Sequence, residues 1–395
     1  MPAVNPPNRQ RLNVVLLGHD PGWAEVVRGQ ASELGIQNVH IASSPEEVIT
    51  LLSGGFPPVS HLLLQPAAAG AMMAELIDMT VGQSLGVSLI VLGEGTTLDR
   101  HPSNNVITFV PEPSAPLLAG ALLNRAAAPR KPKLAPPSLD ELKEALQAAR
   151  FQTRYQPVVR LDTGMPVSLE VLARLEHPTR GILLPDLFVP PIEAAGLAWP
   201  FTQAVITRAF GDWSEGRLGS FGLGLAINFP LDVLLIPEAL IWMEERRKEA
   251  GMPAERIIVE LTESRPVTEL ERLREATTTL RGLGYQLAID DVGPALRDHQ
   301  ALLDMQFTSL KLDKDLVRES PDSPAASAFL SKTIESARTA GLSIIAEGVE
   351  DSEIWRRMQR LGVDEAQGFL IARPLPASAV ALWYKDWVAR IEKPI

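Results

Sequence analysis

The sequence contains no cysteine among its 395 residues. Disulfide bonds and thiolate metal sites are therefore excluded, and any metal ion must be held by oxygen or imidazole ligands. Long apolar runs are also missing, because glycine, proline or charge interrupts each run before it reaches the length of a membrane span. Residues 1–10 are polar and contain proline, unlike a signal peptide. We therefore expect a cytoplasmic protein that does not enter a membrane.

Basic residues are fewer than acidic residues. The chain has 37 Lys and Arg against 48 Asp and Glu, which gives a formal net charge of −11. This balance disfavours nonspecific binding to DNA or to an anionic membrane, so neither is expected as a partner. Hydrophobic residues make up 46% of the chain, enough for a large core, and its length predicts two or three domains.

The first third of the chain alternates short aliphatic strands with helical segments. The expected strands are 13–17, 39–42, 61–64, 89–92 and 106–110, and the expected helices are 24–34, 45–52 and 117–128. This alternation predicts a doubly wound parallel sheet, flavodoxin-like in its fold class. Its length and rhythm resemble a response-regulator receiver domain.

The chemistry of a receiver is missing from this region. At the positions of the acidic pair, the phosphoacceptor Asp, the hydroxyl residue and the Lys-Pro pair stand Gly18-His19, Gln65, Gly93 and Glu112-Pro113. Gln65 offers no carboxylate to phosphorylate, and Glu112 has the wrong charge to pair with a phosphate. We therefore expect a degenerate receiver-like module that contacts a protein signalling partner. His19 and His61 can ligate a metal, although surface or capping roles are commoner for two isolated histidines.

A proline-rich segment separates this module from the rest of the chain. Residues 126–138 contain four prolines and three basic residues, which favour an extended spacer. We predict a receiver-like domain at 1–128, a linker at 129–138 and a second domain at 139–395. Ser138 and Glu141 have the spacing of a capping box, so a helix is expected from Leu139.

The second domain has the rhythm of a (β/α)8 TIM-type barrel of about 250 residues. Eight strands are expected at 155–160, 167–174, 223–228, 257–261, 286–290, 309–312, 343–346 and 366–371. Expected helices include 231–250, 268–283, 325–340 and 352–361, with glycine stops at Gly251, Gly284, Gly341 and Gly362.

Most of these strands end in a polar residue, which predicts a site at the carboxyl rim of the barrel. The set comprises Glu170, Asn228, Glu260, Asp290, Asp291, Lys311, Glu347 and Gln367. Five converging carboxylates repel one another unless a cation lies between them, and all-oxygen ligands suit Mg²⁺ or Mn²⁺. Asp290 is expected as the last residue of its strand and Asp291 as the first of the loop. Two ions sharing an Asp can activate water for attack on phosphorus, and Lys311 adds a fixed positive charge.

Eight motifs occur in the order found in EAL-domain cyclic-di-GMP phosphodiesterases, and the region 139–395 resembles that family. They are Gln156-Pro157-Val158-Val159, Glu170-Val171-Leu172-Ala173-Arg174, Ile227-Asn228, Glu260-Leu261-Thr262-Glu263, Asp290-Asp291, Lys311-Leu312-Asp313, Glu347-Gly348-Val349-Glu350 and Gln367-Gly368. The resemblance implies hydrolysis of cyclic-di-GMP to linear pGpG, and a homodimer is expected.

The resemblance also implies a role for each matched residue. Glu170, Asn228, Glu260, Asp290, Asp291 and Glu347 would bind Mg²⁺ or Mn²⁺. Glu170, Lys311 and Glu347 would be catalytic, with Lys311 positioning the water. Gln156, Leu172, Arg174 and Gln367 would contact the dinucleotide, and Glu263 would stabilise the loop that follows Asp291.

That loop departs from the family. Members continue after Asp-Asp with Phe-Gly-(Thr or Ala)-Gly-Tyr-Ser-Ser-Leu, whereas this chain reads Val-Gly-Pro-Ala-Leu-Arg-Asp-His over 292–299. Two hypotheses stay open: a metal-dependent phosphodiesterase, weak or conditional, and an inactive cyclic-di-GMP receptor that acts through a protein partner. An unrelated barrel hydrolase or lyase fits the ordered motifs poorly.

Overall fold

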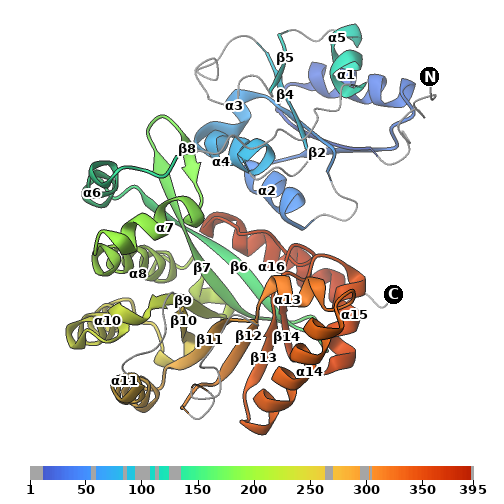
Figure 1. Cartoon of the computed structure of the whole chain (residues 1–395). Coiled ribbons are helices and arrows are strands. Elements are labelled where there is room, and N and C mark those ends of the chain that lie inside the picture. The colour runs from blue at the N-terminus through green and yellow to red at the C-terminus, as the bar shows by residue number, and fades with distance from the viewer. Residues whose placement is uncertain are drawn as a thin grey trace. The chain divides into compact units, whose positions relative to one another are not determined.

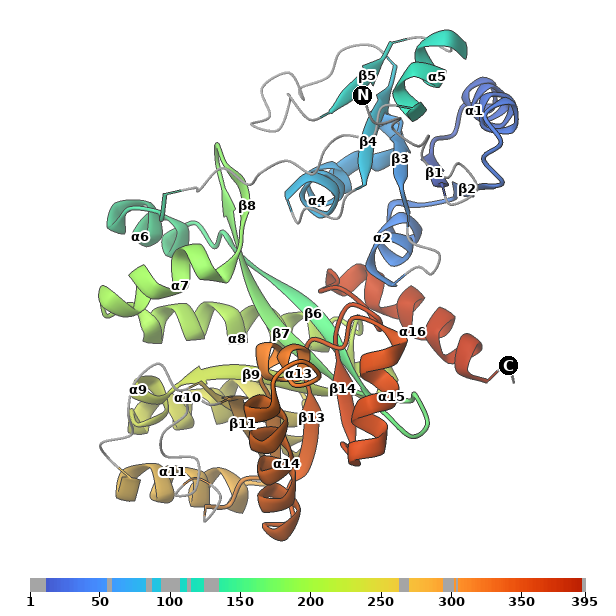
Figure 2. The ribbon, with the colours of Figure 1, turned by 45° about the vertical axis from the view of Figure 1, so that its right-hand side comes forward.

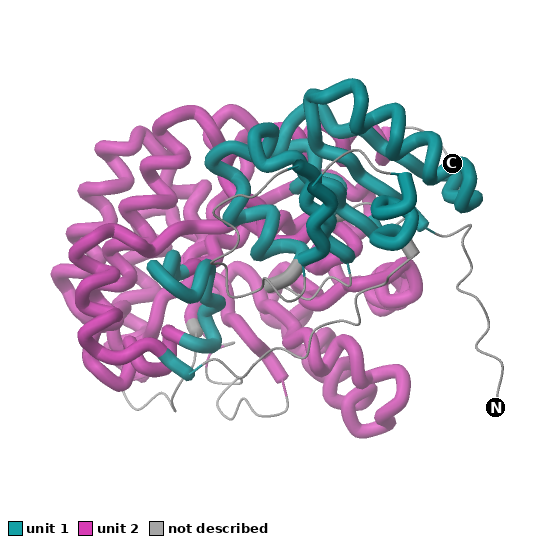
Figure 3. Tube along the Cα trace, turned by 90° about the horizontal axis from the view of Figure 1, so that it is seen from above, with its two compact units in different colours: residues 1–136, 175–187 teal, residues 137–174, 188–395 magenta. Residues whose placement is uncertain are grey.

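The computed structural model describes residues 12–54, 59–82, 87–93, 107–111, 115–123, 135–262, 270–293, 302 and 305–392. The chain divides into two compact units, Met1–Pro136 with Leu175–Leu187, and Pro137–Arg174 with Phe188–Ile395 (Figure 3). Among the described residues, no helix is both long enough and apolar enough to cross a membrane.

The first unit is built on a five-stranded parallel sheet in the order β2-β1-β3-β4-β5. Its strands are β1 (Asn13–Leu17), β2 (Asn38–Ala42), β3 (His61–Leu64), β4 (Ser88–Leu92) and β5 (Thr108–Val110). Every residue of β1, β3 and β4 is buried. Such unbroken burial is typical of a parallel sheet with helices on both faces, which is why these strands read as aliphatic runs rather than as alternating patterns.

Helices cover this sheet. They are α1 (Pro21–Glu33), α2 (Pro45–Gly54), α3 (Pro66–Ala69), α4 (Met73–Ile77) and α5 (Ala115–Leu123). On one face, Trp23 and Val27 of α1 and Leu118 and Leu122 of α5 pack in one core cluster with side chains of β1, β3, β4 and β5. Helices α2 and α4 contact each other.

The second unit contains a closed eight-stranded barrel (Figures 1 and 2). Around it the order is β6-β14-β13-β12-β11-β10-β9-β7, and a pairing of β6 with β7 closes the ring. These strands are β6 (Phe151–Arg160), β7 (Pro166–His177), β9 (Gly224–Pro230), β10 (Ile257–Thr262), β11 (Gln286–Val292), β12 (Ser309–Leu312), β13 (Ser343–Ala346) and β14 (Glu365–Gln367). A short strand, β8 (Gly181–Leu183), pairs antiparallel with residues 175–177 at the C-terminal end of β7.

One strand corrects the expectation of an all-parallel (β/α)8 barrel. Strand β6 runs antiparallel to β14, although the pairs from β7 through β9 to β14 are parallel. The reason lies in the connection between β6 and β7, which spans only residues 161–165. A parallel pair needs a crossover of a dozen or more residues, so this connection permits only a tight turn.

Helices surround the barrel strands (Figure 1). They are α6 (Leu139–Gln147), α7 (Pro185–Ala194), α8 (Ala198–Ser214), α9 (Leu231–Leu234), α10 (Pro237–Glu249), α11 (Leu270–Gly282), α13 (Lys314–Glu319), α14 (Pro324–Thr339), α15 (Ser352–Leu361) and α16 (Ala377–Ile391). The predicted capping box of α6 is confirmed, because Ser138 and Glu141 exchange both hydrogen bonds. The predicted helix 231–250 is instead two helices, with Pro237 beginning the second at a position where its missing N–H costs nothing.

Candidate active site at the carboxyl rim of the barrel

Lys311 lies at the centre of the polar residues that end the barrel strands. It projects from β12 with 1% of its surface exposed. Its Nζ atom is 2.8 Å from Glu347 Oε1, 2.9 Å from Asp290 Oδ1, 3.1 Å from Glu260 Oε2 and 3.7 Å from Glu170 Oε1. Four strands or strand ends therefore bring carboxylates to a single ammonium group, as the alignment of strand ends predicts.

Negative charge exceeds positive charge in this cluster. Five carboxylates, counting Asp291, and one ammonium leave a formal −5 + 1 = −4 when all are ionised. Burial, together with the charge of neighbouring acids, raises the pKa of Glu347 to about 8 and that of Asp291 to about 6. Burial likewise raises the pKa of Glu260 well above its usual range. Burial lowers the pKa of Lys311, but the surrounding carboxylates outweigh this and hold it well above its ordinary value.

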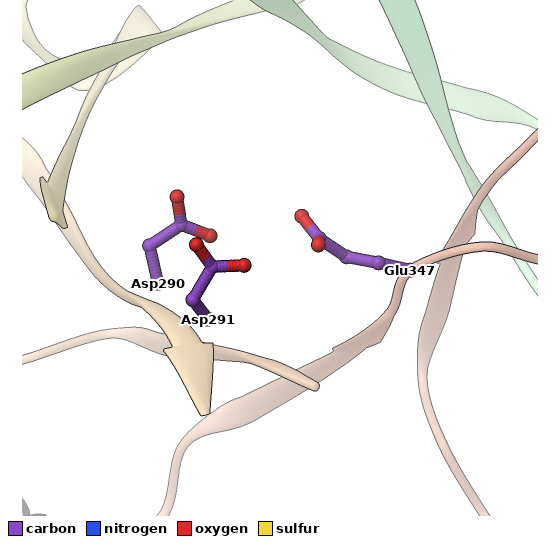
Figure 4. Close-up of side chains that lie close together, drawn as sticks. All are labelled: Asp290, Asp291 and Glu347. Atoms are coloured by element: carbon purple, nitrogen blue, oxygen red, sulfur yellow. The ribbon is translucent and has the colours of Figure 1, made fainter. Parts of the chain in front are cut away.

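The two adjacent acids reach the same side of β11 through an irregular backbone. Side chains of neighbouring residues in a regular strand point to opposite faces. Here Asp291 has a φ of 52°, and the pairing with β12 shifts register between Ile289 and Val292. The strand thus continues to Val292 with a bulge, where the sequence had suggested that it ends at Asp290. Ligand atoms of Asp290, Asp291 and Glu347 all lie within 4.8 Å of one another, and Figure 4 shows the three side chains converging.

This donor set fits a hard divalent cation. Asn228 Nδ2 donates to Glu170 Oε1 over 3.1 Å, which leaves the Asn228 amide oxygen available as a ligand. Asp290 Oδ1 is buried and, despite its ion-pair distance to Lys311, has no hydrogen bond of good geometry. Buried carboxylate oxygens and an amide oxygen are the ligands preferred by Mg²⁺ and similar ions, and a divalent cation would offset the excess negative charge.

Two glutamines expected to contact a dinucleotide also form hydrogen bonds at this cluster. Gln367 Nε2, at the end of β14, donates to Glu170 Oε2 over 2.5 Å and to Gln156 Oε1 over 3.2 Å. Gln156 Nε2 donates to the carbonyl oxygen of Ala372 over 3.1 Å. Sequence motifs identified both glutamines but not this connection, because its last acceptor is a backbone group with no side-chain signature.

The remaining residues of the predicted site are less closely associated. Leu172 and Arg174 follow Glu170 at alternate positions of β7, so the three share one side of the strand. Arg174 is 5% exposed, and its guanidinium donates to the carbonyl of Ala173. Glu263 and residues 294–299 of the altered loop lie outside the described residues.

Sequence reasoning missed an aromatic side chain beyond β14. Phe369 lies two residues after Gln367 and is 41% exposed. The guanidinium carbon of Arg373 is 3.8 Å from the centre of its ring, and burial lowers the pKa of Arg373 to about 10. The signal available in the sequence was an aromatic residue directly after Gln-Gly at a strand end.

The strand ends of the first unit carry no comparable cluster among the described residues. Gln65 Oε1 accepts a hydrogen bond from the Asp20 backbone N–H over 3.2 Å, and its side chain lies against Gly18 so closely that a Cβ there would clash. His61 is fully buried at the start of β3, opposite Val14, whereas His19 is exposed beyond the end of β1. The two histidines therefore lie toward opposite ends of the sheet and cannot share a metal ion.

Comparison with known proteins relates the barrel to a defined family. The family model for the EAL domain matches residues 139–374. The cyclic di-GMP phosphodiesterase RocR of Pseudomonas aeruginosa is 32% identical over 251 residues, which cover 61% of each chain. The phosphodiesterase PdeR of Escherichia coli is 29% identical over 249 residues, covering 63% of this chain and 38% of that protein.

Solved structures agree with this relationship. The PaMucR phosphodiesterase in complex with c-di-GMP has a TM-score of 0.58 at 27% identity, covering 61% of this chain and 98% of that one. The EAL enzyme Bd1971, with cAMP and cyclic-di-GMP bound, has a TM-score of 0.59 at 26% identity, covering 62% and 67%. The chain spans 39% to 61% of the lengths of the first curated relatives that it matches. With its family model matched across more than half of its length, the chain belongs to the EAL domain family.

Proposed function

We propose that the barrel is a metal-dependent phosphodiesterase that hydrolyses cyclic-di-GMP to linear pGpG. The observation that carries the proposal is the cluster of five carboxylates at the carboxyl rim, four of which lie within 4 Å of Lys311 Nζ. Related proteins support the substrate, because RocR and PdeR are named cyclic di-GMP phosphodiesterases and the PaMucR structure contains c-di-GMP.

In this proposal, Glu170, Asn228, Glu260, Asp290, Asp291 and Glu347 hold Mg²⁺ or Mn²⁺. A divalent ion bound there lowers the pKa of a water molecule and offsets charge on phosphorus. Lys311 contributes a fixed ammonium that orients the attacking oxygen and stabilises charge as it develops. Leu172 and Arg174 contact the dinucleotide from β7, and the planar guanidinium of Arg174 matches phosphate geometry.

The direct test is product formation. Purified protein is incubated with cyclic-di-GMP and either Mg²⁺, Mn²⁺ or EDTA, and pGpG is separated by chromatography. The proposal expects pGpG with metal and none with EDTA. Absence of pGpG at every metal concentration would contradict it.

A receptor function is the second candidate, and the altered sequence at 292–299 favours it. If contacts of the family loop are lost, metal binds more weakly and hydrolysis requires elevated Mg²⁺ or Mn²⁺. One lost hydrogen bond of about 1.4 kcal/mol corresponds to about tenfold in affinity. Calorimetric binding of cyclic-di-GMP without any hydrolysis up to high metal concentration would establish the receptor in place of the enzyme.

Residues 1–128 form, in this proposal, a degenerate receiver-like domain joined by a linker at 129–138 to the barrel domain at 139–395. The sheet order β2-β1-β3-β4-β5 supports it, because this is the order of flavodoxin-like domains. Such a domain would bind a protein signalling partner without phosphotransfer. A cytoplasmic homodimer completes the proposal, and light scattering of the full chain tests the dimer.

A further inference from the structure

We propose that Gln367 is a positioning residue that holds Glu170 ready to bind metal, rather than a residue whose amide N–H groups contact the dinucleotide. The inference rests on the metal-binding role proposed above for Glu170. It follows from the number of donors on the Gln367 side chain and from what those donors already contact.

Both oxygens of the Glu170 carboxylate are held by side-chain amides. Oε2 accepts from Gln367 Nε2 over 2.5 Å, and Oε1 accepts from Asn228 Nδ2 over 3.1 Å. Lys311 Nζ is farther away, at 3.7 Å from Oε1. Hydrogen bonds to a charged acceptor are stronger and shorter than neutral ones, so the two amides fix the plane of the carboxylate.

Gln367 is itself rigidly placed. Its carbonyl oxygen accepts from the Val349 N–H over 3.0 Å, and the Leu370 N–H donates to the Val349 carbonyl over 3.0 Å. Gly368 lies so close to the backbone of Val349 that a Cβ at this position would clash. This close approach holds the end of β14 against Val349, two residues after Glu347, and Gln367 is only 3% exposed.

Both hydrogens of the Gln367 side-chain NH₂ are already used in hydrogen bonds. A glutamine NH₂ carries two hydrogens, and Nε2 already donates to Glu170 and to Gln156. Contact between this NH₂ and a phosphate or base would require breaking one of these bonds inside a buried site. Gln367 Oε1 is the free end of the side chain, because it is buried without a hydrogen-bond partner among the described residues. Any direct contact with a ligand is therefore restricted to an N–H or O–H donor on that ligand.

Gln156 provides a matched control, because it is hydrogen-bonded to Gln367 but not to Glu170. Its Oε1 accepts from Gln367 and its Nε2 donates to Ala372, so it does not touch the carboxylate. If Gln367 positions Glu170, loss of its amide weakens metal binding in the absence of any dinucleotide. Loss of the Gln156 amide leaves the bond between Gln367 and Glu170 in place and has a much smaller effect.

The experiment measures Mn²⁺ binding to the full chain by calorimetry, without dinucleotide, for the native protein, Gln367→Met and Gln156→Met. Gln367→Met should bind Mn²⁺ about 10- to 100-fold more weakly, the usual effect of removing a group that orients a metal ligand. Gln156→Met should stay within about threefold of the native protein, because the bond to Glu170 persists. Gln367→Leu is measured in parallel, with circular dichroism to verify folding of each variant.

Kinetics then separate positioning from substrate contact. At saturating Mn²⁺ the KM of Gln367→Met for cyclic-di-GMP should match that of the native protein, whereas the Mn²⁺ concentration for half-maximal rate should rise. If the native protein and the folded Gln367 variants bind Mn²⁺ equally well, and the variants have a raised KM at every metal concentration, this inference is wrong. The proposed metal-dependent function would still stand. Failure of the native protein to bind Mn²⁺ would overturn the proposed metal-dependent function, and this inference with it.

Discussion

The two sheets of this chain differ most at the carboxyl ends of their parallel strands. In the barrel these ends carry buried Lys311 and three buried carboxylates, Glu170, Glu260 and Asp290, which lie within 4 Å of its Nζ atom. In the first unit the ends of β1 and β3 carry Gly18 and Gln65. The Gln65 side chain accepts a hydrogen bond from the backbone N–H of Asp20. At this edge of the sheet, neutral groups therefore connect the loops that follow β1 and β3. The comparison teaches that parallel topology provides the place for a site, while single residues at strand ends decide whether chemistry occurs there.

The largest expected effect comes from removing the central cation. Lys311→Met leaves Glu260, Asp290 and Glu347 buried against one another. We expect the free energy of unfolding in EDTA to fall by about 3–5 kcal/mol, the usual cost of breaking a buried ion pair from one side. Added Mn²⁺ should restore part of the loss. Urea unfolding followed by tryptophan fluorescence measures both, with the exposed Lys332→Met as control. Unchanged stability in EDTA would contradict the central role of Lys311.

Glu170→Ala should abolish hydrolysis while the barrel stays folded. Loss of a group that orients a metal ligand costs about 10- to 100-fold, so loss of a ligand should exceed about 100-fold in rate. The measurement is pGpG formation at saturating Mn²⁺, with thermal unfolding as the check on folding. Normal rates in a folded variant would remove Glu170 from the site.

The opposite end of the barrel sharpens the comparison, because among the described residues its partly buried acid belongs to no cluster of potential metal ligands. Glu365, at the start of β14, lines a cavity of about 210 Å³ together with Ser168, Ser309 and Ser343. Burial raises the pKa of Glu365 to about 7 from 4.5. Below pH 4.5 both the folded and the unfolded protein carry the proton, so there is no effect. Between about pH 4.5 and 7 the folded protein binds the proton more tightly, so the charge on Glu365 destabilises the fold as pH rises.

Glu365→Gln should therefore increase stability at pH 8 by up to about 3 kcal/mol and leave it unchanged at pH 4. Thermal unfolding at the two pH values measures the difference. The exposed Glu335→Gln serves as the control and should show no such pH dependence. A stabilisation of equal size at both pH values would mean that packing in the cavity, and not charge, is responsible.

The smallest effect, no change in the mass of the protein, is expected for the five-stranded sheet of the first unit. Incubation of the chain with a small phosphodonor and Mg²⁺ should add no phosphate, as judged by intact mass, because Gln65 cannot form an acyl phosphate. Gln65→Asp should also stay unmodified, since Gly18 and His19 replace the acids that would hold magnesium. An acid-labile adduct on the native domain would break the contrast between the two sheets.

Much of this architecture could be predicted because each element has a local cause in the sequence. Aliphatic runs gave the strands, and the bounds of β12 and β13 match the expectation to the residue. The reversed direction of β6 was also within reach, since residues 161–165 are too few for a parallel crossover. Strand β14 was expected to reach residue 371 but ends at Gln367, before Gly368 passes the backbone of Val349. That shortening depends on a contact between distant segments, which no local pattern reports.

The residues of the candidate site were more predictable than the hydrogen bonds between them. Strand-end position identified Glu170, Asn228, Glu260, Lys311 and Glu347 as neighbours, and this is where the structure brings them. The hydrogen bonds of Gln367 to Glu170 and Gln156 depend on the antiparallel pairing of β6 with β14. The rotamers and the choice of donor depend on packing between these two strands, so the sequence alone could not predict these hydrogen bonds.

The left-handed backbone at Asp291 places stability and activity in conflict at one position. A non-glycine residue in this region costs about 1–2 kcal/mol relative to an ordinary conformation, although Asp tolerates it better than most. Although the residue is exposed, partial desolvation of its carboxyl group and the charge of Asp290 beside it raise its pKa to about 6. Glycine at 291 relieves both penalties and removes the acid. A laboratory selection for heat resistance alone would therefore favour Asp291→Gly and enrich well-folded barrels that have lost a metal ligand, so thermostability engineering of this protein should hold residue 291 fixed.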